Sequence, residues 1–173
     1  MNRSVLAICS LLILVLSYAC IETDPISPVP EITYTSIELS VVYDPKLEQD
    51  ILTAILKFEF QDGDADFGVY EEIASDSTLP DSVRYNLFLI DYYKLDGVYY
   101  LIEHDTNNPP PYYTIFYNQK FDRVGQYKIV KGNITLTITD IPDYDTIKYD
   151  FYIRDRAAHN SNIESTPDLG TNF

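Results

Sequence analysis

The sequence TAILKFEFQDGDADFG, residues 53–68, carries the pattern that decides the fold. In its first half the apolar side chains of Ala54, Leu56, Phe58 and Phe60 share one parity. Lys57 and Glu59 occupy the opposite parity. Successive side chains of a β-strand point to opposite faces of the sheet, so this segment predicts a strand with one buried face. The strand then runs directly into an acidic, glycine-containing loop.

The same two-residue period recurs along most of the chain. It is present in residues 37–41, 134–139 and 147–154. Residues 85–95 and 98–103 are two β-rich runs separated by Asp96-Gly97, a dipeptide typical of a two-residue hairpin. With a short strand expected at 112–117, the pattern predicts an all-β protein of seven to eight strands. An immunoglobulin-like or fibronectin type III-like β-sandwich fits best, and a small β-barrel is the alternative.

The N-terminal residues have the features of an export signal. Arg3 precedes the apolar run 5–16, and Ala19 comes immediately before Cys20. The apolar run is shorter than the roughly 20 residues needed to span a bilayer about 30 Å thick. The arrangement resembles the lipobox of bacterial lipoproteins, although Ser17 replaces the usual leucine. We therefore expect residues 1–19 to be a signal peptide and Cys20 to be lipidated. An ordinary secretory signal followed by a stray cysteine is the alternative.

Composition limits the partners of the mature chain. Residues 20–32 contain the lipidated Cys20 followed by a proline-rich stretch that predicts an extended tether, and residues 33–173 form the expected β-sandwich domain. The formal net charge of −15 argues against nucleic-acid binding and against direct contact with anionic lipid headgroups. Lipid would then be the membrane contact. Cys9 leaves with the signal, so no disulfide is available to stabilise the domain.

The loop that follows residues 53–61 contains the one constellation with metal chemistry. Asp62, Asp64 and Asp66 stand at alternate positions beside glycines. Calcium prefers six to eight oxygen ligands, several of them carboxylates. The segment is not an EF-hand, because Phe67 replaces the obligatory glycine of that loop and Ile73 replaces its final glutamate.

Strand parity predicts further calcium ligands. Asp62 continues the inward face after Phe60, and Asp155 continues the inward face after Ile153. The second and sixth strands of an immunoglobulin-like sandwich run in the same direction, so both acidic ends should reach one pole. We therefore expect Asp62, Asp64, Asp66 and Asp155 to surround one Ca²⁺ ion in a structural role. Asn160 or backbone carbonyls would complete the shell. Alternatively, these aspartates serve only as turn formers and caps.

Several segments resemble an uncharacterised family of Bacteroidota-type lipoproteins. They are Pro30-Glu31-Ile32, Tyr85-Asn86-Leu87-Phe88, residues 62–68 and residues 155–162. Members of that family carry DGDGDIG where this chain has DGDADFG. The resemblance implies a β-sandwich anchored to the outer membrane. The family has no established activity that the resemblance could transfer to this chain. Glu22 and Asp24 are similar to surface-export signals of such bacteria.

No catalytic constellation is recognisable in the sequence. The chain has two histidines, His104 and His159, without a G-x-S-x-G or H-E-x-x-H motif, so we expect no enzymatic activity. The 16 tyrosines include the pairs Tyr92-Tyr93, Tyr99-Tyr100 and Tyr112-Tyr113. An outward row of these rings would suit a protein or glycan partner at the cell surface. The leading interpretation is a structural or interaction lipoprotein of the cell envelope, and a glycan-binding accessory protein is the alternative.

Overall fold

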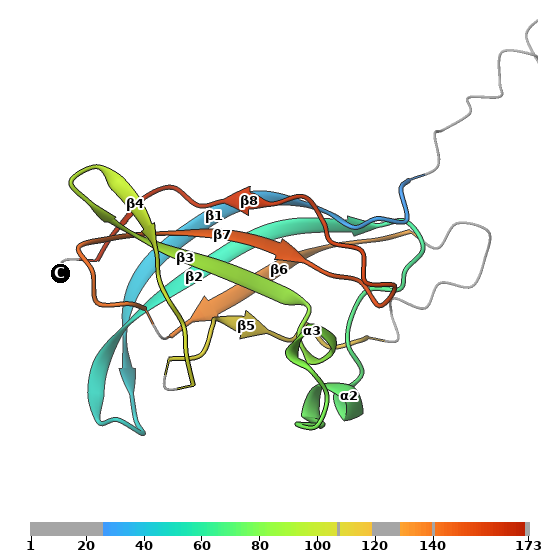
Figure 1. The fold of residues 1–173 in the computed structure, drawn as a ribbon, viewed down its shortest axis with the longest axis horizontal. Coiled ribbons are helices and arrows are strands. Elements are labelled where there is room, and N and C mark those ends of the chain that lie inside the picture. The colour runs from blue at the N-terminus through green and yellow to red at the C-terminus, as the bar shows by residue number, and fades with distance from the viewer. Residues whose placement is uncertain (1–25, 107, 119–128, 140, 172–173) are drawn as a thin grey trace, which may run out of the picture.

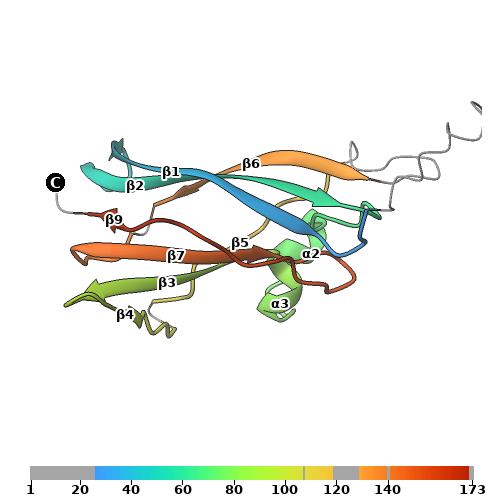
Figure 2. The same cartoon turned by 90° about the horizontal axis from the view of Figure 1, so that it is seen from above.

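The computed structural model describes residues 26–106, 108–118, 129–139 and 141–171. The signal segment and Cys20 lie outside these residues. Nine strands and two short helices make up the described part of the chain, and the strands form two antiparallel sheets packed as layers (Figures 1 and 2). The prediction of an all-β sandwich is therefore confirmed. Within the described residues, no helix has the length and apolar character needed to cross a membrane.

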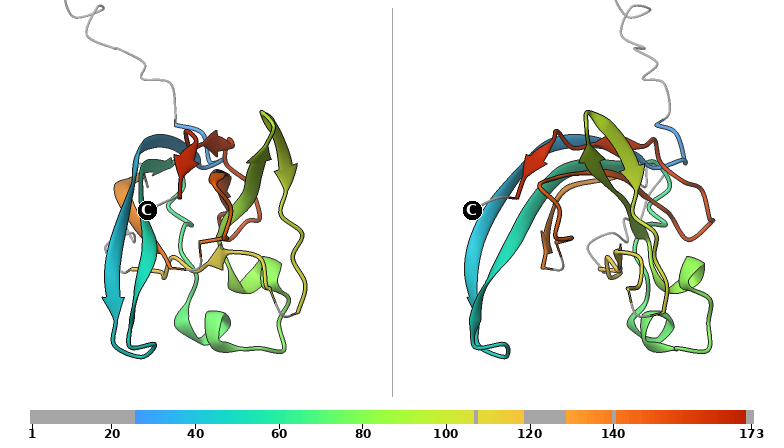
Figure 3. Two further views of the ribbon diagram at one scale, coloured as in Figure 1. Left: turned by 90° about the vertical axis from the view of Figure 1, so that its left-hand side faces the viewer. Right: turned by 60° about the vertical axis from the view of Figure 1, so that its left-hand side comes forward.

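The first sheet has the order β1-β2-β6. Its strands are β1 (Glu31–Asp44), β2 (Gln49–Asp62) and β6 (Val130–Ile138). β1 therefore begins two residues before the predicted domain boundary. A register shift between Tyr34 and Ser36 interrupts the β1–β2 ladder. Figure 3 shows the two strands curving together as one long ribbon toward their hairpin.

The second sheet has the order β4-β3-β7-β8. It contains β3 (Leu87–Leu95), β4 (Val98–Leu101), β7 (Thr146–Ile153) and β8 (Glu164–Ser165). Two further short strands join it: β5 (Tyr112–Tyr113) pairs with β3, and β9 (Leu169–Gly170) pairs with β7. The helices α2 (Glu71–Ser75) and α3 (Asp81–Arg84) lie between β2 and β3 in the chain. Each is too short to produce a helical period, which is why the sequence pattern did not predict them.

The core lies between the sheets and follows the predicted parities. The Phe58 and Phe151 ring centroids, one from each sheet, are 5.1 Å apart. Phe67 belongs to the acidic loop, yet it is fully buried, and its ring lies 4.7 Å from that of Phe60. Burying a side chain of this size stabilises a fold by about 1.5–3 kcal/mol. Phe67 therefore anchors the acidic loop at the end of the core where β2 and β7 finish.

Candidate metal centre

Three aspartates converge where β2 ends. Asp62, Asp64 and Asp66 each place one carboxylate oxygen within 4.8 Å of the other two. We call these three residues the acidic cluster. Asp62 is the last residue of β2 and is completely buried, while Asp64 and Asp66 are partly buried. The inward strand position explains this burial, because Asp62 extends the row that contains Phe58 and Phe60 into the core.

The carboxylate of Asp62 has no compensating partner among the described residues. Neither of its two oxygens accepts a hydrogen bond, and Oδ1 of Asp66 is likewise buried without a partner. Burial, followed by the nearby charges of Asp64, Asp66 and Asp155, raises the pKa of Asp62 from 3.8 to about 7. Burial also raises the pKa of Asp66, together with the charges of Asp155 and Asp64. A buried, unpaired carboxylate is costly, so this arrangement favours a cation among the oxygens.

Hydrogen bonds fix the acidic loop to the segment after β7. The backbone N–H of Arg156 donates to the carbonyl oxygen of Asp66 at 3.2 Å, and the N–H of Ala157 donates to Oδ2 of Asp66 at 3.0 Å. Arg156 Nη1 also donates to the carbonyl oxygens of Phe67, at 3.1 Å, and Gly68, at 3.2 Å. Two loops almost ninety residues apart in sequence therefore form one unit. Sequence reasoning missed the part that Arg156 plays in it, and the only signal was its position directly after Asp155.

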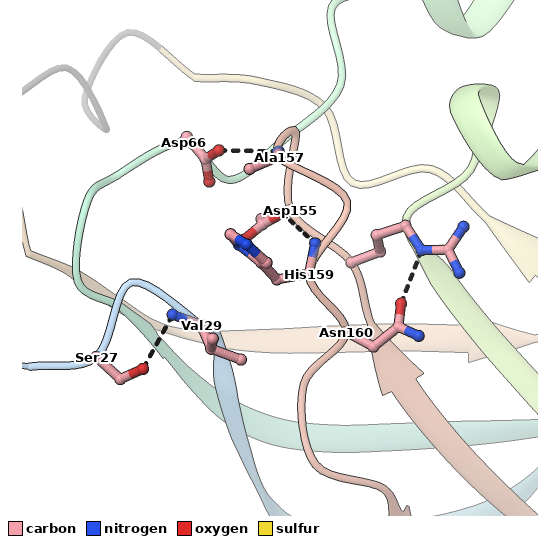
Figure 4. Close-up of polar contacts among 8 residues, drawn as sticks. Ser27, Val29, Asp66, Asp155, Ala157, His159 and Asn160 are labelled. Atoms are coloured by element: carbon pink, nitrogen blue, oxygen red, sulfur yellow. Dashed lines mark hydrogen bonds and ion pairs between the residues drawn. The ribbon is translucent and has the colours of Figure 1, made fainter.

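Asp155 reaches this pole but stands beside the acidic cluster. Its side chain is fully buried, and its charge raises the pKa of both Asp62 and Asp66. Its Oδ1 accepts the backbone N–H of His159 at 2.7 Å, and its Oδ2 lies 2.9 Å from Nδ1 of the same residue. Figure 4 shows this pairing. The carboxylate of Asp155 is thus held by its own loop, in contrast to that of Asp62.

Asn160 does not join the acidic cluster. Its Oδ1 accepts a hydrogen bond from Nε of Arg154 at 2.7 Å, and its side chain is directed away from Asp66 and Asp155 (Figure 4). The ligand role expected for Asn160 has no support in this geometry. The physical reason is the bridge between Arg154 and Asn160, which turns the chain back beside the end of β7.

The backbone before β1 also contacts the acidic loop, and the sequence did not predict this contact. A Cβ atom built on Gly63 would lie 2.3 Å from the carbonyl oxygen of Ser27 and 2.4 Å from that of Ile26. These distances are far below van der Waals contact, so Gly63 permits a close approach that no other residue allows. The glycine between Asp62 and Asp64 was the only sequence signal for this contact.

The tyrosine pairs are only partly available as an outward row. The ring of Tyr93 stacks between those of Tyr100, at 5.3 Å, and Tyr144, at 4.3 Å. The hydroxyl of Tyr99 donates to Asp168 at 2.5 Å. Several of these rings therefore contact one another or the domain surface. Tyr112 and Tyr113 instead line a cavity of about 750 Å³ together with Tyr85, Tyr144 and the three prolines 109–111.

Comparison with known proteins finds no match for this chain: no family model matches it, and neither does a curated protein or a solved structure.

Proposed function

We propose that this chain is a non-catalytic lipoprotein of the cell envelope whose β-sandwich binds one Ca²⁺ ion at the acidic cluster as a structural clamp. The observation that carries the calcium proposal is Asp62: it is fully buried, and neither carboxylate oxygen has a hydrogen-bond partner among the described residues. Asp64 and Asp66 add negative charge to this environment. A bound cation would balance the charge that the surrounding chain leaves uncompensated.

The ligand atoms favour calcium over other metals. The acidic cluster offers carboxylate oxygens alone, without thiolate or imidazole, and hard cations prefer such ligands. Ca²⁺ accepts irregular, crowded coordination, whereas Mg²⁺ requires near-ideal octahedral geometry and retains several waters. The ion would join the end of β2 to the loop 155–157, which already shares hydrogen bonds with Asp66. It would therefore stabilise the sandwich where no disulfide does.

Calcium titration of the chain tests this proposal. Calorimetry should detect one Ca²⁺ per chain. Free Ca²⁺ at 100 times its dissociation constant should stabilise the protein by about 2.7 kcal/mol, which corresponds to roughly 5–10 °C in Tm for a domain of this size. Asp62→Asn should abolish the effect. Asp96→Asn is the matched control, because Asp96 is exposed in the β3–β4 hairpin. An unchanged Tm with calcium or with chelator would refute the calcium proposal.

The envelope location rests on the sequence before the domain. The export signal, Cys20 and the proline-rich stretch support attachment through an N-terminal lipid, and membrane fractionation tests this attachment. Cys20→Ser should move the protein from the membrane fraction to the soluble fraction.

The strand orders β1-β2-β6 and β4-β3-β7-β8 support the finer immunoglobulin-like interpretation, as does the resemblance to the Bacteroidota-type lipoproteins.

The tyrosine-lined cavity favours a second candidate function, the binding of a neutral glycan. Its walls combine aromatic rings and rigid prolines with the carboxylates of Asp81 and Asp143. Carboxylates accept hydrogen bonds from sugar hydroxyls, and among the described residues no lysine or arginine lines the cavity to hold an anion. A glycan array with Tyr112→Ala should show loss of any neutral glycan bound here. Tyr70→Ala is the control, because Tyr70 does not line this cavity.

A further inference from the structure

The chain enters the domain directly over the acidic loop. The carbonyl oxygens of Ile26 and Ser27 approach the backbone of Gly63, which joins Asp62 to Asp64. Carbonyl oxygens carry partial negative charge and are ordinary ligands of Ca²⁺. Two of them therefore converge on a loop that already carries three carboxylates, one of them buried without a partner.

Local contacts order this entry segment, residues 26–30, and the first residues of β1 that follow it. The N–H of Val29 donates to Oγ of Ser27 at 3.0 Å, which closes a short turn (Figure 4). Pro30 is buried. Beyond it, the side chain of Asn162 accepts the N–H of Ile32 at 2.8 Å and donates to the carbonyl oxygen of Ile32 at 2.9 Å. The path of the chain into β1 is thus fixed, and it directs residues 26 and 27 to the acidic loop.

We propose that the carbonyl oxygens of Ile26 and Ser27 belong to the calcium site, so that the bound ion fastens the entry segment to the sandwich. This inference rests on the proposed function, because it requires calcium at the acidic cluster. The entry segment leads back toward Cys20, so calcium would control how closely the domain is held to its anchor. At roughly 3.3 Å per extended residue, release of residues 26–30 would lengthen the connection between the anchor and the domain by at most about 16 Å.

Hydrogen exchange of the full chain, kept in detergent, tests the inference directly. Exchange is measured by mass spectrometry in calcium and in chelator, on a peptide that covers residues 26–32 and on one that covers the β3–β4 hairpin. We expect calcium to slow exchange in the first peptide at least tenfold and to leave the hairpin unchanged. Asp62→Asn should remove the protection.

Gly63→Ala separates the entry segment from the carboxylates. The added methyl group would displace residues 26 and 27 while all three aspartates remain, so calcium affinity should fall at least tenfold and the protection of 26–32 should disappear. Gly170→Ala is the matched control, because a Cβ atom there meets nothing within 4 Å. The wild-type exchange measurement decides the question even if Gly63→Ala fails to fold.

The outcomes distinguish the two proposals. Calcium binding by calorimetry without a change in exchange at residues 26–32 would overturn this inference and leave the calcium clamp standing. Wild-type calcium affinity in a folded Gly63→Ala variant would do the same. Absence of calcium binding altogether would overturn both proposals.

Discussion

Asp62 and Asp91 are two buried aspartates on the inward faces of their strands, yet their surroundings differ completely. Asp62 follows Phe58 and Phe60 on the inward face of β2, and Asp91 follows Leu87 and Leu89 on the inward face of β3. Their exposed fractions are 0% and 3%. Oδ1 of Asp91 lies 2.6 Å from Nε2 of His104, whereas Asp62 has other carboxylates as its charged neighbours.

The difference separates a buried carboxylate that has a partner within the chain from one that has none among the described residues. The ring of His104 lies between Asp91 and the carbonyl oxygen of Asn108, which is 3.2 Å from Nδ1. This pair ties the segment after β4 to the sheet and gives the buried charge a partner within the chain. Asp62 has no such partner among the described residues, so a proton or a bound cation would have to balance its charge. Burial is therefore common to both aspartates, and what distinguishes Asp62 is that its carboxylate has no hydrogen-bond partner among the described residues.

Removal of His104 should produce the largest effect on stability. His104→Ala leaves Asp91 buried and unpaired, and breaking a buried pair in this way costs about 3–5 kcal/mol. Thermal unfolding should show a Tm lower by roughly 6–20 °C, equally in calcium and in chelator. The double variant Asp91→Leu/His104→Leu should recover most of the loss. A calcium-dependent loss in His104→Ala would break the distinction between the two aspartates.

Protonation of Asp62 should make the calcium-free protein more stable at pH 5.5 than at pH 7.5. Its pKa is about 7 in the folded chain, above the ordinary value of 3.8, so the folded state binds the proton more tightly than the unfolded state. Stability from this group is complete below pH 4 and is lost as pH rises toward and through 7. Between pH 5.5 and pH 7.5 the loss amounts to about 2 kcal/mol, or roughly 4–8 °C in Tm.

Thermal unfolding in chelator at these two pH values checks the expectation. Asp62→Asn should lose this part of the pH dependence and should be more stable than the wild type at pH 7.5. Asp96→Asn, the exposed control, should keep the wild-type slope. If Asp62→Asn retained the full slope, another group would be responsible, and the contrast with Asp91 would weaken.

The sequence was sufficient to predict what strand periodicity controls. Parity placed Asp62 and Asp155 at the inward ends of β2 and β7, and the structure brings both to one pole. Parity also places Asp91 in the core row of Leu87 and Leu89, which the sequence reading did not use. The sequence did not predict loop geometry. The turn that pairs Asp155 with His159 depends on Ala158 at φ 68°, a conformation with no side-chain signature. The carbonyl contacts of Ile26 and Ser27 are equally invisible, because every residue carries the same backbone.

Backbone strain in the acidic loop offers the smallest and most discriminating test of the comparison. Ala65 at φ 59° and Ala158 at φ 68° both adopt the left-handed conformation, which costs an L-residue about 1–2 kcal/mol and glycine almost nothing. Ala158 is exposed, so Ala158→Gly should raise Tm by roughly 2–3 °C after the entropy cost of glycine. Ala65 is only 5% exposed, and loss of its buried methyl group, worth about 0.8 kcal/mol, should cancel most of the gain in Ala65→Gly.

The variants Ala65→Gly and Ala158→Gly are both measured by thermal unfolding in chelator and in calcium. The calcium-induced shift in Tm should match the wild type in each, because neither change touches a carboxylate. A larger gain for Ala65→Gly than for Ala158→Gly in chelator would mean that strain, rather than uncompensated charge, is the main cost of the acidic loop. The contrast between Asp62 and Asp91 would then not account for the cost of this loop.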